Sequence, residues 1–240
     1  MSEDEEFNGI YLCTDEHLEF IDALKTSANF SKEVLNNTYA MKWLILALHA
    51  ALQGACVCAL ESIHGQTDGS LSVKSQKEYA ETKRFAEEYQ DIVAEYNNGD
   101  RKKFDQLSKG VRNALLREPK LADFLTLFEW IKNPERLLPP YTFNQNIGIY
   151  GDVKRLHKLR NNVIHFTPKG WSVELSGMPR IVSSVTEVIE HLAVKQPSFT
   201  SHLTDENVQQ VKQSLEDIRN NISEWARQHN LQDGPRPAPG

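Results

Sequence analysis

Apolar residues recur along most of the chain at spacings of three and four, the period of a helix with one buried face. The pattern predicts an opening helix that begins near Thr14 or Asp15. Further helices are predicted over residues 31–63, 76–96, 102–116, 121–132, 146–163, 179–194 and 205–228. Residues 170–175 alternate like a strand, but they lack a partner and predict at most a small hairpin or an extended loop. The fold class expected from this pattern is all-α, a multi-helix bundle.

Polar turn residues separate the helical segments. Residues 64–70 and 97–100 are rich in Gly, Asn and Asp, and Asp100 can cap the helix that follows it. The end of the chain has the composition of a disordered tail. We therefore expect one α-helical domain over residues 1–230, with its core motif at 153–170, elaborating helices over 76–132 and a tail at 231–240.

The composition places the chain among ordinary soluble globular proteins, with 40% hydrophobic and 25% charged residues and a formal net charge of −6. The acidic start contains no apolar run, so no signal peptide is expected. The most apolar region, residues 39–60, is interrupted by Lys42, His49 and Gln53, which favours a buried bundle helix over a membrane span. The odd count of three cysteines, without secretory context, predicts reduced thiols in a cytoplasmic protein, and their spacing matches neither a metal-binding nor a redox motif.

One segment, residues 153–169, is strongly basic. It contains no acid and five cations, Lys154, Arg155, Lys158, Arg160 and Lys169. Such a local excess of positive charge can hold a phosphate backbone even in a protein that is acidic as a whole. The alternative is a helix face that is solvated or paired with acids from elsewhere in the chain. The charge pattern leaves both interpretations open.

Helical geometry sorts the side chains of this segment into separate faces. One stripe, predicted to be buried, contains Leu156, Leu159, Val163 and Phe166. His157, Asn161 and His165 follow one another at intervals of four and share a second face. Arg160 lies about 140° around a straight helix from His165. These two side chains can meet on one ligand only if the helix ends between them, or if a second copy of the protein supplies one of them.

The hexapeptide Arg160-Asn161-Asn162-Val163-Ile164-His165 resembles the Arg-polar-x-x-x-His signature of the HEPN superfamily. These are all-α domains, and many of them are metal-independent endoribonucleases. The resemblance implies a bundle of four or five helices and a dimer that brings two motifs together. It also implies RNA cleavage that leaves a 2′,3′-cyclic phosphate, commonly in toxins, phage-defence effectors or RNA-processing modules.

The chemistry of RNA cleavage gives the residues of the motif their expected roles. RNA carries its own nucleophile, the 2′-hydroxyl, so neither a metal nor a cofactor is required. His165 is the candidate general acid or base, and Arg160 is the candidate ligand of the scissile phosphate. Asn161 is expected to hold the His165 tautomer or to contact the phosphate. Substrate contacts are expected from Lys154, Arg155, His157, Lys158 and Lys169.

The histidines outside the motif give no signal of a metal site, and two of the tryptophans are predicted to be structural. The histidines outside the motif have no spacing typical of metal ligands, so no metal site is expected at His49, His64, His191, His202 or His229. Trp43 and Trp130 lie in apolar, periodic surroundings and are predicted to be core residues.

Three functions follow from these observations. The first is a cytoplasmic HEPN-type endoribonuclease that acts on RNA as a homodimer, in a toxin or phage-defence system with an antitoxin or regulatory protein as a further partner. The alternative is a non-catalytic HEPN-like helical module that binds RNA, nucleotide or a protein partner. In the third, the protein is a helical scaffold, with His165 a helix-end histidine and Arg160 a surface ion-pair partner. No membrane association is expected from any of them.

Overall fold

The chain is helical almost throughout the part that its structure, a computed structural model, describes. This part comprises residues 14–64, 84–85, 87–115, 121–137, 140–143, 147–165 and 172–231. No β-strand occurs among these residues, so the expected all-α class is confirmed. Contacts divide the chain into two units, residues 1–63 with 128–240, and residues 64–127.

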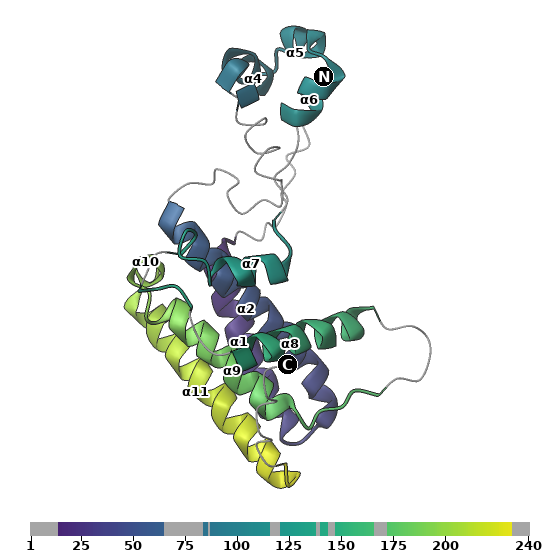
Figure 1. Cartoon of the computed structure of the whole chain (residues 1–240), viewed down its shortest axis with the longest axis vertical. Helices are drawn as coiled ribbons and strands as arrows, with labels where there is room; N and C mark the ends of the chain where they lie inside the picture. Colours follow the sequence, from purple (N-terminus) through teal and green to yellow (C-terminus); the bar gives the residue numbers. More distant parts are fainter. Residues whose placement is uncertain are drawn as a thin grey trace, which may run out of the picture. The chain divides into compact units, whose positions relative to one another are not determined.

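The larger unit is a bundle built from long helices. It contains α1 (Glu16–Val34), η1 (Thr38–Ala40), α2 (Met41–His64), α8 (Ile147–Ile164), α9 (Met178–Ala193), α10 (Pro197–Thr200) and α11 (Asp205–Gln228). Helix α11 packs between α1 and α9, and α9 packs in turn against α8 (Figure 1). Helix α2 contacts α1 at Gly54 and α8 at His49, which closes the ring of helices.

Capping side chains fix the beginnings of the first and last helices. Asp15 precedes α1, and its carboxylate accepts a hydrogen bond from the Leu18 N–H at 2.8 Å. Thr204 precedes α11, and its hydroxyl oxygen accepts from the Asn207 N–H at 3.2 Å. The predicted bounds of α11 are confirmed, and its apolar stripe is buried up to Trp225.

The prediction of one helix from Ser31 to residue 63 is wrong at its start. Ser31 lies inside α1, where it is buried and its hydroxyl donates to the Ala28 carbonyl at 2.7 Å. The break falls at Asn36 and Asn37 instead, and the Asn37 side chain accepts from the Tyr39 N–H at 3.1 Å to begin η1. Asparagine competes with helical hydrogen bonding in this way, and that turn signal outweighs the apolar periodicity on either side of it.

Helix α2 contributes many of the fully buried residues of the bundle. Among the described helices it is the one that is long and apolar enough to cross a membrane, with a mean hydropathy of 1.9 over Thr38–Leu60, but 67% of that window is buried inside the protein. A Cβ added at Gly54 would lie 3.3 Å from the Phe20 Cα, so glycine permits the close approach of α1. Trp43, predicted to be core, is 47% exposed and stacks on Phe30 at the surface of the bundle.

In the described part of the smaller unit lie the short helices α4 (Gln90–Asn97), α5 (Lys102–Gln106) and α6 (Lys109–Leu115). The predicted turn after α4 is confirmed, since Gly99 has a φ of 94° and the Asp100 carboxylate accepts from the Lys102 N–H at 3.1 Å. The single helix expected over 102–116 is two helices, because Leu107 is extended. Helix α7 (Phe124–Trp130) spans the boundary between the units in sequence.

Candidate functional site

Helix α8 carries the candidate motif and is anchored through its buried side. Leu156 is fully buried and Leu159 is buried, as the stripe predicted, whereas Val163 is only half-buried. Phe166, the fourth member of that stripe, lies outside the described residues. Asp152 is also buried, and it accepts hydrogen bonds from the Arg180 Nε at 2.9 Å and from the Ser184 hydroxyl at 2.8 Å. This ion pair with α9 holds α8 in a fixed position.

The helix is continuous from Arg160 to Ile164. The His165 N–H still donates to the Asn161 carbonyl at 2.9 Å, so the helical hydrogen bonding extends to the histidine. Helix α8 ends at Ile164, but His165 keeps the last helical hydrogen bond, so the backbone makes no turn between the two residues that would bring their side chains together. Arg160 is half-buried and His165 is exposed. A shared site for both side chains now requires a second copy of the chain.

A chain of four polar side chains links Arg160 to the interior of the bundle. The Arg160 Nη1 donates to the Asn161 Oδ1 at 2.9 Å, and the Asn161 Nδ2 lies 3.2 Å from the His157 Nε2. The His157 Nδ1 in turn lies 3.0 Å from the Nε2 of His49 on α2. We call these four residues the polar relay. It joins two helices whose contributing histidines are 108 positions apart in sequence.

The direction of every hydrogen bond in the polar relay follows from the arginine. A guanidinium can only donate, so the Asn161 oxygen accepts and its amide nitrogen must donate to the His157 Nε2. The ring hydrogen of His157 is then on Nδ1, where it donates to the His49 Nε2. His49 therefore acts as an acceptor at Nε2, and the relay is satisfied when both imidazoles are neutral.

Burial keeps His49 in that neutral state. Its side chain is only 3% exposed, and burial, assisted by the nearby His157 and Arg160, lowers its pKa from 6.5 to about 3. Strongly shifted pKa values of this kind concentrate at functional sites, although structural networks produce them too. The sequence predicted no metal site at His49, and the one signal that marked this residue was a histidine in the middle of the most apolar helix.

The cations of the basic segment differ in their availability. Arg155 forms an ion pair with Glu174, so the acid-paired interpretation is correct for this residue. The Lys154 ammonium lies 4.4 Å from the centre of the Tyr150 ring, and Lys158 is exposed. Lys169 lies outside the described residues. The positive charge that faces solvent on the described part of α8 is therefore smaller than the sequence predicted.

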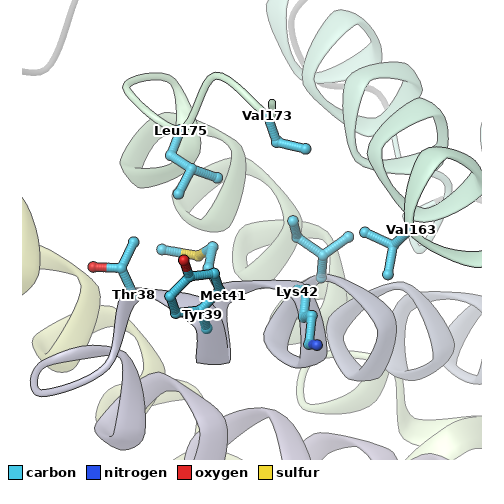
Figure 2. A pocket seen from close by; sticks show the side chains of 8 residues that line it. Thr38, Tyr39, Met41, Lys42, Val163, Val173 and Leu175 are labelled. Carbon is cyan, nitrogen blue, oxygen red and sulfur yellow. The ribbon is translucent and has the colours of Figure 1, made fainter. Parts of the chain in front are cut away.

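An apolar pocket of about 420 Å³ lies beside the C-terminal end of α8. Its wall combines the beginning of α2, Val163 of α8 and the extended residues Val173 and Leu175 (Figure 2). The alternation in residues 170–175 that suggested a strand thus reflects side chains directed at this pocket, in an extended loop over the described residues 172–175. Lys42 supplies a charged group to a lining that is otherwise mostly apolar.

Comparisons with protein-family models, with curated proteins and with solved structures return no match. The polar relay and the exposed His165 beside it are therefore the features from which a function is inferred.

Proposed function

We propose that the protein is a metal-independent endoribonuclease whose site is built on the C-terminal half of α8. The observation that carries this proposal is the polar relay, which holds Arg160 through Asn161 and His157 against the buried His49. Side chains that only solvate a helix do not require a network that begins at a buried histidine, because burying a polar group costs free energy unless it is paired. The resemblance of residues 160–165 to the HEPN signature supports the same assignment.

The proposed reaction needs a base, an acid and a ligand for the phosphate, and His165 and Arg160 supply these three roles. A general base takes the proton from the RNA 2′-hydroxyl, whose oxygen attacks the phosphorus atom. A general acid returns a proton to the departing 5′-oxygen, and the bond to that oxygen breaks to leave a 2′,3′-cyclic phosphate. His165 is the exposed imidazole available for both transfers: it accepts the 2′-hydroxyl proton as the base and, as the imidazolium so formed, returns it to the departing 5′-oxygen. Arg160 binds the phosphate oxygens with the guanidinium donors that Asn161 does not occupy.

Two copies of the chain are part of this proposal. Because α8 is uninterrupted from Arg160 to Ile164, Arg160 and His165 of one copy diverge around the helix. In a homodimer with facing α8 helices, Arg160 of one copy can meet His165 of the other across a shared RNA phosphate. A free nuclease of this type would damage cellular RNA, so we place it with a regulatory or antitoxin protein.

The uninterrupted helix also favours a second function, a helical module that binds RNA, nucleotide or a protein partner without cleaving RNA. In that case Arg160 serves as a phosphate ligand, and His165 is an exposed helix-end residue. This function predicts binding to RNA or nucleotide that depends on Arg160 and is indifferent to His165.

A cleavage assay distinguishes the two functions. Full-length protein is incubated with end-labelled RNA in the presence of EDTA, and the product ends are identified chemically. The nuclease proposal predicts 2′,3′-cyclic phosphate ends from the wild type, and a loss of cleavage of about 100-fold or more in Arg160→Ala and in His165→Ala. The exposed neighbour Asn162 supplies the matched control, and Asn162→Ala should cleave normally. Binding without cleavage by the wild type would contradict the nuclease proposal and support the binding module.

A further inference from the structure

We infer that His49 is a positioning residue for Arg160, acting from the core of the bundle through His157 and Asn161. The inference deepens the proposed function, on which its consequence for RNA rests. Its structural basis is the unbroken order of contacts from His49 Nε2 to His157 Nδ1, from His157 Nε2 to Asn161 Nδ2, and from Asn161 Oδ1 to Arg160 Nη1. His49 touches no proposed reacting atom, so it is not a catalytic residue.

The placement of His49 makes it the fixed end of the polar relay. The other three members lie within one turn of one another on α8, and Arg160 and Asn161 are partly exposed to solvent. His49 comes from α2, is 3% exposed, and has core residues such as Ile45 and Leu52 on the same helix. Its imidazole therefore has little freedom to rotate, and its Nε2 presents a stationary acceptor to the His157 ring.

Loss of that acceptor would be transmitted to the arginine one hydrogen bond at a time. Without the acceptor on His49, the His157 tautomer that carries its hydrogen on Nε2 becomes accessible. This hydrogen would then face the Nδ2 of Asn161, which is also a donor. The conflict is relieved when the Asn161 amide turns over and presents its nitrogen to Arg160. Two donors then face each other and the guanidinium leaves its position, because arginine has no acceptor. His49 thus controls a half-exposed phosphate ligand without touching it.

Nitrogen NMR of the histidine rings tests this inference without RNA. In the full-length wild type, His157 should carry its hydrogen on Nδ1, and the Arg160 Nε–H signal should report a guanidinium with restricted motion. His49→Phe, which fills the space without an acceptor, should shift His157 towards the Nε2–H tautomer and release Arg160. His49→Gln, whose carbonyl oxygen can accept, should restore both signals at least in part. The exposed His202 serves as the control, and His202→Phe should change neither signal.

The result that would overturn the inference is equally specific. A wild-type His157 with its hydrogen on Nε2 would contradict the derived direction of the polar relay. His157 and Arg160 signals that stay unchanged in a folded His49→Phe variant would show that His49 does not position Arg160. If His49→Phe does not fold, the comparison between wild type and His49→Gln decides, since Gln must retain the Nδ1–H tautomer for the inference to stand.

A double-mutant cycle connects the inference to RNA. The probe is a short fluorescein-labelled single-stranded RNA of mixed sequence, titrated with full-length protein. His49→Phe should weaken binding roughly three- to tenfold, on the scale of one hydrogen bond, and should have no further effect in an Arg160→Ala background. If His49→Phe weakened RNA binding equally in the wild-type and Arg160→Ala backgrounds, transmission through Arg160 would be ruled out. If the wild type does not bind RNA at all, the proposed function fails, and the NMR signals alone decide whether His49 positions Arg160.

Discussion

Acidification should destabilise this protein through His49, and the size of the effect can be worked out from its burial. The side chain is 3% exposed, and burial chiefly, with His157 and Arg160, lowers its pKa from 6.5 to about 3. Between these two values the unfolded chain binds a proton at His49 and the folded chain does not. The free energy of unfolding therefore decreases as the pH falls through this window and is unaffected above it.

The size of this loss of stability follows from how far the pH lies below the ordinary pKa of histidine. At about pH 5 the medium is 1.5 units below the unfolded value of 6.5. At about 1.36 kcal/mol per unit, His49 accounts for a loss of about 2 kcal/mol relative to about pH 7.5. A loss of that size is a substantial fraction of the stability of an ordinary domain.

Equilibrium urea unfolding of the wild type and of His49→Gln, each at both pH values, isolates this contribution. Other groups titrate in both proteins, including His17, whose pKa is also lowered by burial, so their effects cancel in the comparison. His49→Gln is expected to be less stable at neutral pH and to lose about 2 kcal/mol less than the wild type on acidification. If the two proteins lose stability equally, to within about 0.5 kcal/mol, His49 is protonated in the folded state and the reasoning is refuted.

Three further predictions concern packing and reactivity. Gly54→Val should lower the free energy of unfolding by roughly 2 kcal/mol because the new side chain meets α1; Ala50→Val, at an exposed position on the same helix, is the control, and equal losses would contradict the close approach. Asp152→Ala should lower the free energy of unfolding in urea by about 3 kcal/mol, since it leaves Arg180 without its buried carboxylate. A change below about 0.5 kcal/mol would show that this ion pair does not anchor α8. The Cys56 thiol, whose pKa is raised by complete burial, should react with a thiol reagent only after unfolding, which mass spectrometry of labelled peptides can determine; labelling at the rate of an unfolded peptide would contradict its burial.

Local patterns predicted the parts of the fold that local physics decides. The bounds of α11 and the buried stripe of α8 follow from helical periodicity, and the turn at Gly99 follows from its residue types. The helix break at Asn36 and Asn37 was missed because the apolar period continues in phase on both sides of it. Trp43 was misplaced because periodicity gives a face of the helix, and whether a neighbour covers that face depends on the tertiary structure.

Only part of the candidate site could be predicted, because sequence patterns are local and do not reveal contacts between distant residues. Its members on α8 are close in sequence, so their spacing on one helix was evident. The partners from elsewhere were not, since His49 lies 108 positions from His157 and Glu174 follows Arg155 by 19. A charge count over a segment cannot detect an acid that the fold brings back to it, and ligand spacing along one helix cannot detect a histidine on another.

Complementation between two inactive variants tests the shared site most directly. Arg160→Ala and His165→Ala are each expected to be inactive in RNA cleavage with EDTA present. When the two are coexpressed in equal amounts, half of the dimers combine both variants, and each such dimer has one site with Arg160 and His165 intact. The mixture should therefore recover about a quarter of the wild-type cleavage, with 2′,3′-cyclic phosphate ends. A mixture that stays inactive while the wild type cleaves would contradict a site shared by two copies, and a wild type that never cleaves RNA would contradict the nuclease itself.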